Sequence, residues 1–243
     1  MKLIKPYYEI ITPINGEQIL KQIEFAARTC YKSEGKIEYE TKEVVIENTQ
    51  HGSTTIEDYT AKSARVLILK LMQRNHEAML EFGGNITVKF VCDRGISHEL
   101  VRHRLVSFAQ ESTRYCDYGN QEHIVFIIPN WINDEQIELV QRMNENNYTQ
   151  IYETTKAWYT LILESEQAYN FLIKQDWSPQ QARSVLPNSL KTEINMSANI
   201  REWRHILKLR TSDAAHPQMQ ELMRPLLDEL KTKIPILFDD INY

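Results

Sequence analysis

Several features that would place this chain in a special class are missing from its 243 residues. The three cysteines, Cys30, Cys92 and Cys116, lie far apart and lack CxxC spacing, which indicates neither a disulfide framework nor a zinc knuckle. A reducing cytoplasm is therefore the simplest compartment. No stretch approaches the roughly 20 apolar residues of a membrane-spanning helix. The first ten residues have no long apolar run and no small-residue cleavage site, so we expect no signal peptide.

A basic surplus is missing as well. The chain has 28 Lys and Arg against 33 Asp and Glu, a formal net charge of −5. Nucleic-acid-binding domains usually carry the opposite imbalance, so any basic site here must be local and suits a small anionic ligand. Hydrophobic residues make up 42% of the chain and charged residues 25%, which is typical of a globular protein with a sizeable core.

The hydrophobic pattern predicts mixed secondary structure. Alternating residues predict strands over 85–92, 123–128 and 190–198. Helical periodicity predicts helices over 15–32, with Asn15 as N-cap, and over 60–75, 95–104 and 200–209, and a short helix after Thr41. Residues 134–175 are predicted to form one helix or two. Two further helices are predicted, one from Ser178-Pro179 to before Pro187 and one over 217–234 with a kink at Pro225. No linker rich in Gly, Pro or Ser interrupts the chain. We therefore expect an α/β or α+β fold, one domain over residues 1–243 with a central sheet flanked by long helices.

The run 102–115, RHRLVSFAQESTRY, concentrates polar hydrogen-bonding groups in the middle of the chain. Cations at the end of a helix complement its dipole, an effect of a few tenths to about 1 kcal/mol. That effect does not explain why Ser107, Gln110, Ser112 and Arg114 follow at once. Several donors close together are what the oxygens of a phosphate or pyrophosphate require.

The spacing RHR-x2-S-x4-S-x-R in this run resembles the signature of the flavin-dependent thymidylate synthases. These enzymes make thymidylate from deoxyuridylate (dUMP), using FAD, NADPH and methylenetetrahydrofolate. The resemblance implies a substrate-binding set and a cofactor-binding set in this part of the chain. The first set is Glu99, Arg102, Gln110, Ser112 and Arg114, and the second is Arg102, His103, Arg104 and Gln110. Gln110 stands where many relatives carry Glu, and Ala109 where they often carry Asn or Ser.

Four further segments resemble the same family in the same order. The resemblance implies that ARTCY (27–31) approaches the flavin through Cys30 and HEAMLEF (76–82) through His76, and that QARSVLP (181–187) places Arg183 on the nucleotide. The stretch SANIREWRHILKLRTSDAAHP (197–217) implies contacts of Asn199, Arg201 and His205 with FAD, and His216 fits the closing motif of the family. Arg210 matches the arginine that polarises the uracil ring, so it is our catalytic residue and also part of the substrate-binding set.

The resemblance also implies an enzyme without an essential protein nucleophile, in which Ser112 is a hydrogen-bond donor, and a cytoplasmic homotetramer with active sites at subunit interfaces. It implies no metal. Three alternatives stay open. The Arg/His run, with Phe108 and Tyr115 interleaved, could bind a nucleic acid. Ser112 or Cys116 with His103 could serve a hydrolase, although no GxSxG turn is present. The chain could also share the fold without the activity.

Overall fold

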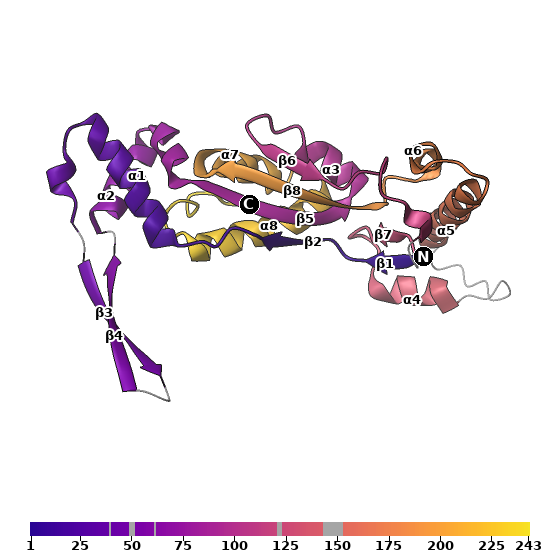
Figure 1. The fold of residues 1–243 in the computed structure, drawn as a ribbon, viewed down its shortest axis with the longest axis horizontal. Coiled ribbons are helices and arrows are strands. Elements are labelled where there is room, and N and C mark those ends of the chain that lie inside the picture. The colour runs from indigo at the N-terminus through magenta and orange to yellow at the C-terminus, as the bar shows by residue number, and fades with distance from the viewer. Residues whose placement is uncertain (39, 49–51, 61, 121–122, 143–152) are drawn as a thin grey trace. The chain divides into compact units, whose positions relative to one another are not determined.

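The computed structural model describes residues 1–38, 40–48, 52–60, 62–120, 123–142 and 153–243. The chain forms two compact units. The first unit comprises residues 1–10, 88–196 and 215–222, and the second comprises residues 11–87, 197–214 and 223–243. Helices and strands alternate along the chain, so the mixed α and β fold class is confirmed (Figure 1). The single domain over residues 1–243 stays a prediction.

A four-stranded sheet with the order β2-β5-β8-β6 organises the first unit. Its strands are β2 (Tyr7–Ile10), β5 (Asn85–Asp93), β8 (Lys191–Asn199) and β6 (Ser107–Gln110), and the last residues of β8 and the first of β5 belong to the second unit. β2 runs antiparallel to β5, with Tyr7 opposite Val91. A separate pair joins β1 (Lys2–Ile4) in parallel to β7 (Val125–Ile127). The strands predicted over 85–92 and 190–198 are thus confirmed almost to the residue.

The helices of the first unit are α3 (Arg94–Leu100), α4 (Asp134–Arg142), α5 (Glu153–Lys174) and α6 (Pro179–Ala182), with short 3₁₀ turns at Tyr118–Asn120 and Arg183–Val185. The predicted helix over 134–175 is therefore two helices, and residues 143–152 between them lie outside the described part of the chain. A buried cluster packs α5 against the β1-β7 pair, because one face of each element is apolar. Its members are Tyr118, Ile124, Phe126, Ile162, Tyr169, Ala182 and Leu190.

Helices dominate the second unit. They are α1 (Gly16–Cys30), α2 (Lys62–Gln73), the 3₁₀ helix η2 (Glu77–Gly83) and α7 (Ile200–Arg210), together with the larger part of α8 (Pro217–Lys233). α1 begins where expected, because the Asn15 side chain accepts a hydrogen bond from Gln18 N at 3.0 Å. Trp203 of α7 is fully buried and donates its indole N–H to Ile86 O at 2.9 Å. This hydrogen bond holds α7 against the start of β5.

Two sequence-based expectations are wrong. Residues after Thr41 form no helix but the strand β3 (Glu40–Asn48), which pairs antiparallel with β4 (Gly52–Thr60). β-Branched residues are frequent in both segments, and their restricted side chains favour strands over helices. The helix predicted to reach Arg104 ends at Leu100, because hydrogen bonds from Arg102 N to Glu99 O and from His103 N to Leu100 O tighten its last turn.

Gly16 approaches the end of α8 so closely that a methyl group there would meet the backbone carbonyl of Lys233. A backbone atom cannot move aside as a flexible side chain can. We therefore expect Gly16→Ala to lower the free energy of unfolding by about 1–3 kcal/mol. The control is Gly35→Ala, since no atom lies within 4 Å of the added methyl group there. Urea denaturation of both variants checks this, and equal midpoints would contradict the close approach.

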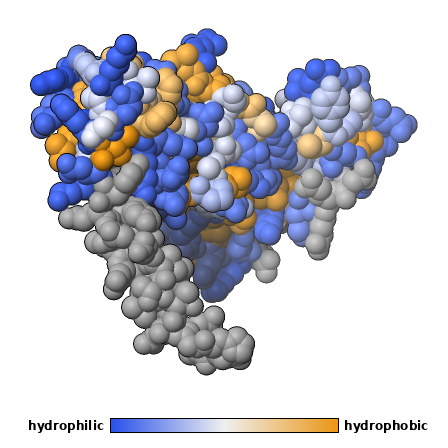
Figure 2. All heavy atoms as spheres, turned by 60° about the vertical axis from the view of Figure 1, so that its left-hand side comes forward, coloured by the Kyte–Doolittle hydropathy of each residue, from blue (hydrophilic) through white to orange (hydrophobic). Residues whose placement is uncertain are grey.

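Hydrophobic residues form small separate patches among hydrophilic ones on the face shown in Figure 2. Several large apolar side chains of the second unit are exposed, among them Phe25, Tyr31 and Phe82. No helix among the described residues combines the length and the apolar character that crossing a membrane requires.

Candidate functional site

Gln110, at the end of β6, is held by two hydroxyl groups of the first unit. Its amide nitrogen donates to Ser97 Oγ at 2.9 Å and to Thr192 Oγ1 at 3.2 Å. Ser97 Oγ itself donates to Arg94 O at 3.0 Å, so its single proton is committed and it must accept from Gln110. A carboxylate cannot donate to either hydroxyl. The amide of Gln110, which replaces the glutamate that many relatives carry, therefore supplies the donor that the Ser97 and Thr192 hydroxyls accept.

Two motifs that lie 70 residues apart in sequence meet beside Ser112. Arg183 Nη1 donates to Thr113 Oγ1 at 3.0 Å, and Thr113 is only 6% exposed. Ser112 Oγ accepts from Arg114 N at 3.3 Å, which tightens the turn between them. The Arg114 guanidinium is exposed and lies 5.4 Å from the centre of the Tyr115 ring. Four candidate positions, 110, 112, 114 and 183, thus belong to one region of the first unit.

Glu111 fixes the backbone between Gln110 and Ser112, and the sequence reasoning missed it. Its Oε1 accepts from Tyr118 Oη at 2.9 Å, and its Oε2 accepts from Lys191 Nζ at 3.1 Å and from Glu193 N at 3.2 Å. Lys191 also pairs with Glu193 Oε1 at 2.6 Å. The signal in the sequence was the alternation of Lys191 and Glu193 along one face of a predicted strand. These bonds set the position of the neighbouring candidate residues.

The charges of this network stabilise one another. Hydrogen bonds from Lys191 and Lys89 hold the pKa of Glu193 below its usual value, although burial works against them. Burial works to lower the pKa of Lys191, and the hydrogen bonds with Glu193 and Glu111 more than offset it, so this pKa is raised. Burial and the Glu111 carboxylate both raise the pKa of Tyr118, which stays a donor throughout the physiological range.

Removing the Tyr118 hydroxyl tests the Glu111 network. We expect Tyr118→Phe to lower the free energy of unfolding by about 1 kcal/mol or more, since the partly buried Glu111 carboxylate loses a donor. Tyr7→Phe serves as the control, because Tyr7 is 52% exposed. Chemical denaturation at neutral pH measures both. Equal stability of Tyr118→Phe and the unchanged chain would show that the hydrogen bond contributes nothing.

The remaining candidates of the first unit surround the end of α3. Glu99 is half-buried in the last turn of this helix. Arg102 and Arg104 follow it in the turn and are exposed, whereas His103 between them is only 6% exposed. The two guanidinium groups are therefore accessible to an anionic ligand.

In the second unit, three of the segments expected near a flavin converge on η2. Cys30 at the end of α1 lies with its Sγ 3.9 Å from Met79 Sδ of η2. Arg201 of α7 donates from Nη1 to Glu81 Oε1 of η2 at 2.6 Å, and both side chains are about half exposed. The segments ARTCY, HEAMLEF and SANIREWRH, far apart in sequence, are thus neighbours in this unit.

The candidate residues of the second unit differ in their exposure and in the hydrogen bonds that they make. His76 precedes η2 and is exposed, as is His205 on α7. Asn199 is the N-cap of α7, since its Oδ1 accepts from Glu202 N at 2.9 Å. Its amide nitrogen is the group that remains suited to a ligand. Arg210 is the last residue of α7 and is partly buried.

Arg204 of α7 is only 1% exposed. Its guanidinium makes a bidentate pair with Asp240, Nη1 to Oδ1 at 2.6 Å and Nη2 to Oδ2 at 2.8 Å. Nη2 also donates to Glu77 Oε1 at 3.0 Å, and Nη1 to Leu237 O. Arg204 therefore ties η2 to the C-terminal segment, next to the candidate residues His76 and Arg201. A charged residue inside a helical run carries no local signal of burial.

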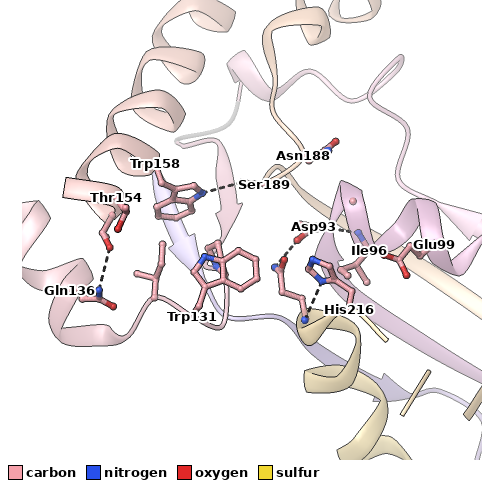
Figure 3. Close-up of a pocket in the computed structure, with 15 residues that line it drawn as sticks. Asp93, Ile96, Glu99, Trp131, Gln136, Thr154, Trp158, Asn188, Ser189 and His216 are labelled. Carbon is pink, nitrogen blue, oxygen red and sulfur yellow. Dashed lines mark hydrogen bonds between the residues drawn. The ribbon is translucent and has the colours of Figure 1, made fainter. Parts of the chain in front are cut away.

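The first unit also contains a cavity of about 360 Å³ (Figure 3). Of the candidate site residues only Glu99 lines it. Two tryptophans, Trp131 and Trp158, and His216 form much of its wall. The sequence reasoning gave no role to either tryptophan.

Comparison with known proteins agrees with the resemblance found in the sequence motifs. A family model described as thymidylate synthase complementing protein matches residues 15–236. The flavin-dependent thymidylate synthase of Corynebacterium efficiens is 32% identical over 234 residues, covering 95% of this chain and 82% of that protein. The protein of the same name from Mycobacterium marinum is 28% identical over 236 residues, with the same coverage of 95% and 82%.

Solved structures with a similar fold include the UMP/dUMP methylase PolB of Streptomyces cacaoi bound with 5-Br UMP. That structure superposes with a TM-score of 0.69 at 17% identity, covering 98% of this chain and 95% of PolB. The complex of PolB with 5-Br dUMP gives a TM-score of 0.70 at 19% identity, with 98% and 96% coverage. At these identities the likeness concerns the fold alone.

Proposed function

Since this chain belongs to the family of the thymidylate synthase complementing proteins, the flavin-dependent thymidylate synthases, we propose that it methylates dUMP to thymidylate with methylenetetrahydrofolate as carbon donor and NADPH-reduced FAD. The observation that supports this most is the bond from Arg183 to Thr113. It joins the two motifs to which the resemblance gives the nucleotide.

Most of the residues proposed to bind the nucleotide belong to the first unit, and Arg210 belongs to the second. Arg114 and Arg183 are exposed and suited to a phosphate, because a guanidinium offers two parallel donors to its oxygens. Ser112, next to Thr113 in the chain, adds a hydroxyl. The full proposed set is Glu99, Arg102, Gln110, Ser112, Arg114, Arg183 and Arg210.

The donors of the second unit fit FAD. Arg201 is half exposed and its partner Glu81 is a surface carboxylate, so the guanidinium can exchange that partner for a pyrophosphate oxygen at little cost. His76, His205 and the Asn199 amide add further donors. The proposed cofactor-binding set is Cys30, His76, Arg102, His103, Arg104, Gln110, Asn199, Arg201 and His205. When bound, FAD supplies the reducing power, and the protein binds and orients.

Arg210 is the proposed catalytic residue. Methylation at C5 of uracil requires electron density at that carbon, and a guanidinium beside the pyrimidine carbonyls stabilises the negative charge that develops on the ring. No cysteine nucleophile is needed. Burial raises the pKa of the Cys92 thiol to about 12, so this residue is not a thiolate near neutral pH. Ser112 acts as a donor to the substrate.

The co-substrates and the assembly complete the proposal. NADPH is the reductant, methylenetetrahydrofolate is the carbon donor, and the enzyme is a cytoplasmic homotetramer whose active sites lie at subunit interfaces. A net-acidic chain has to gather positive charge locally to hold four anionic ligands, and the accessible arginines of both units supply it.

Anaerobic reduction of the FAD-loaded chain by NADPH, with and without dUMP, tests the proposal through the loss of flavin colour. We expect dUMP to accelerate reduction, and Arg114→Ala to abolish this acceleration because the variant lacks a phosphate contact. The control is Arg142→Ala, whose side chain is 79% exposed on α4. If reduction is indifferent to dUMP in the unchanged chain, nucleotide and flavin do not share a site and the proposal is wrong.

The other readings have no support in the comparisons. The relatives named above are thymidylate synthases, not nucleic-acid-binding proteins or hydrolases. Ser112 Oγ accepts a hydrogen bond from the backbone of Arg114, which is the role of a turn residue.

A further inference from the structure

Glu111 is the one acidic residue in the run 102–115, which otherwise gathers arginines and hydrogen-bonding side chains. Ser112 and Arg114, both proposed to bind the nucleotide, follow it directly. A carboxylate beside a phosphate site repels the phosphate unless a cation neutralises it. The position of this acid therefore needs a structural reason.

Both oxygens of the Glu111 carboxylate are engaged, and its side chain is 15% exposed. Oε1 accepts from the Tyr118 hydroxyl at 2.9 Å. Oε2 accepts from Lys191 Nζ at 3.1 Å and from Glu193 N at 3.2 Å. Because the three donors come from β8 and from the 3₁₀ turn Tyr118–Asn120, they fix the side chain against two separate elements.

The negative charge of Glu111 is balanced within the first unit. Lys191 lies between two carboxylates, 3.1 Å from that of Glu111 and 2.6 Å from that of Glu193. Lys89 pairs with the other oxygen of Glu193. Two lysines thus face two carboxylates, and the network adds no net negative charge beside Ser112.

The backbone on both sides of Glu111 is held as well. Glu111 N donates to Glu193 O at 2.9 Å, which extends the pairing of β6 with β8 beyond Gln110. Ser112 O then accepts from Cys116 N at 2.9 Å, and Ser112 Oγ accepts from Arg114 N at 3.3 Å. The turn that carries Ser112 and Arg114 therefore begins directly at the fixed residue.

Tyr118, which donates to the Glu111 carboxylate, is itself immobilised. It is 4% exposed, and its backbone N–H donates to the Tyr169 hydroxyl at 3.3 Å. The two rings meet edge-to-face with centroids 6.0 Å apart, and Tyr169 is fully buried. The hydrogen bond from Tyr118 therefore anchors Glu111 to the buried core of the unit.

We propose that Glu111 is a positioning residue for the phosphate of the nucleotide. It does not touch the ligand, but it holds the Ser112 hydroxyl and the turn to Arg114 where the phosphate oxygens meet them. The inference rests on the proposed function, in which these two residues bind dUMP. Positioning and electrostatics predict opposite results when the charge of Glu111 is removed. Electrostatics alone gives tighter phosphate binding, whereas loss of positioning gives weaker binding.

Calorimetric titration of the full chain with dUMP, and with deoxyuridine, which lacks the phosphate, tests the proposal. We expect Glu111→Gln to weaken dUMP binding about tenfold, because an amide presents one accepting oxygen in place of two. Binding of deoxyuridine should change by less than about twofold. In steady-state turnover the KM for dUMP should rise about tenfold and kcat stay within about threefold, a split that a general loss of structure does not produce.

Glu193→Gln is the matched control. It removes one negative charge from the same network and keeps both backbone hydrogen bonds between residues 193 and 111. We expect its affinity for dUMP to stay within about twofold of the unchanged chain. Tyr118→Phe keeps the charge of Glu111 and removes one donor, so it should weaken dUMP by a smaller factor of about three. It decides the same question if Glu111→Gln does not fold.

Two results would overturn the inference. One is a Glu111→Gln chain that binds dUMP as tightly as the unchanged chain or more tightly. The other is an equal weakening of dUMP and deoxyuridine, which would remove the phosphate from the effect. An unchanged chain that binds no dUMP contradicts the proposed function instead.

Discussion

Thymidylate formation by the Arg210→Met chain is expected to fall by about two to three orders of magnitude, as removal of a single charge-stabilising donor from an active site usually does. Methionine keeps the length and apolar stem of arginine and removes the guanidinium. The loss should appear mainly in kcat, because the charge on the pyrimidine develops in the transition state and not in the bound substrate. Steady-state kinetics with varied dUMP separates kcat from KM.

Lys208→Met is the matched control for Arg210→Met. Lys208 lies two residues earlier on α7, its side chain is 47% exposed, and its nearest carboxylates are 3.6 and 3.7 Å away. We expect its activity to stay within about threefold of the unchanged chain, as for most exposed charges. An Arg210→Met chain with unchanged kcat would remove Arg210 from the chemistry and leave it as a helix-end cation.

The second large effect concerns stability. Asp240→Asn is expected to lower the free energy of unfolding by about 2 kcal/mol, because the fully buried Arg204 guanidinium loses its bidentate partner. The value stays below that of a completely buried pair, since the Asp240 side chain is 45% exposed. Glu229→Gln on α8 breaks a surface pair with Lys233 at 3.5 Å and should cost under about 1 kcal/mol. Urea denaturation compares the two variants, and equal effects would contradict a special role for Arg204.

The Asp240 effect should depend on pH with a definite sign. The hydrogen bonds from Arg204 hold the pKa of Asp240 below its ordinary value in the folded chain. A depressed pKa contributes stability above the unfolded pKa of about 3.9, and this contribution is lost as the pH falls through the folded pKa. The stability difference between the unchanged chain and Asp240→Asn should therefore be constant near neutrality and shrink below about pH 4. A difference that grows on acidification would contradict this assignment.

Elements with strong local signals were predictable from the sequence. α1 has an asparagine cap and an apolar face at helical spacing, and β8 alternates strictly over its nine residues. Both signals act within a few residues, so the sequence carries them without knowledge of the fold.

Elements that depend on partners were not predictable. β2 and β6 have four residues each and exist because β5 and β8 offer them hydrogen bonds. The sequence predicts a short helix after Thr41, where the strand β3 forms, since charged residues interrupt its β-branched ones and hide the period of two. The end of α3 was placed four residues late because the tight turn after Leu100 has neither glycine nor proline.

The residues of the candidate site also fall into those that the sequence indicated and those that only the fold reveals. The motif residues were selected by resemblance, and the contact between Arg183 and Thr113 supports two of these motifs. Glu111 and Arg204 were missed because their roles come from pairing with distant residues, Lys191 in one case and Asp240 in the other. The sequence does not show which charged residues will be buried or which partners they will meet. Buried ion pairs between distant residues are therefore not predictable from sequence patterns.

The most direct measurement is the formation of thymidylate by the purified chain. dUMP labelled in the uracil ring is incubated with methylenetetrahydrofolate, NADPH and FAD, and the product is separated by chromatography. We expect labelled thymidylate that requires every component and is nearly absent with Arg210→Met. A chain that binds FAD and dUMP but forms no thymidylate under these conditions would contradict the proposed reaction.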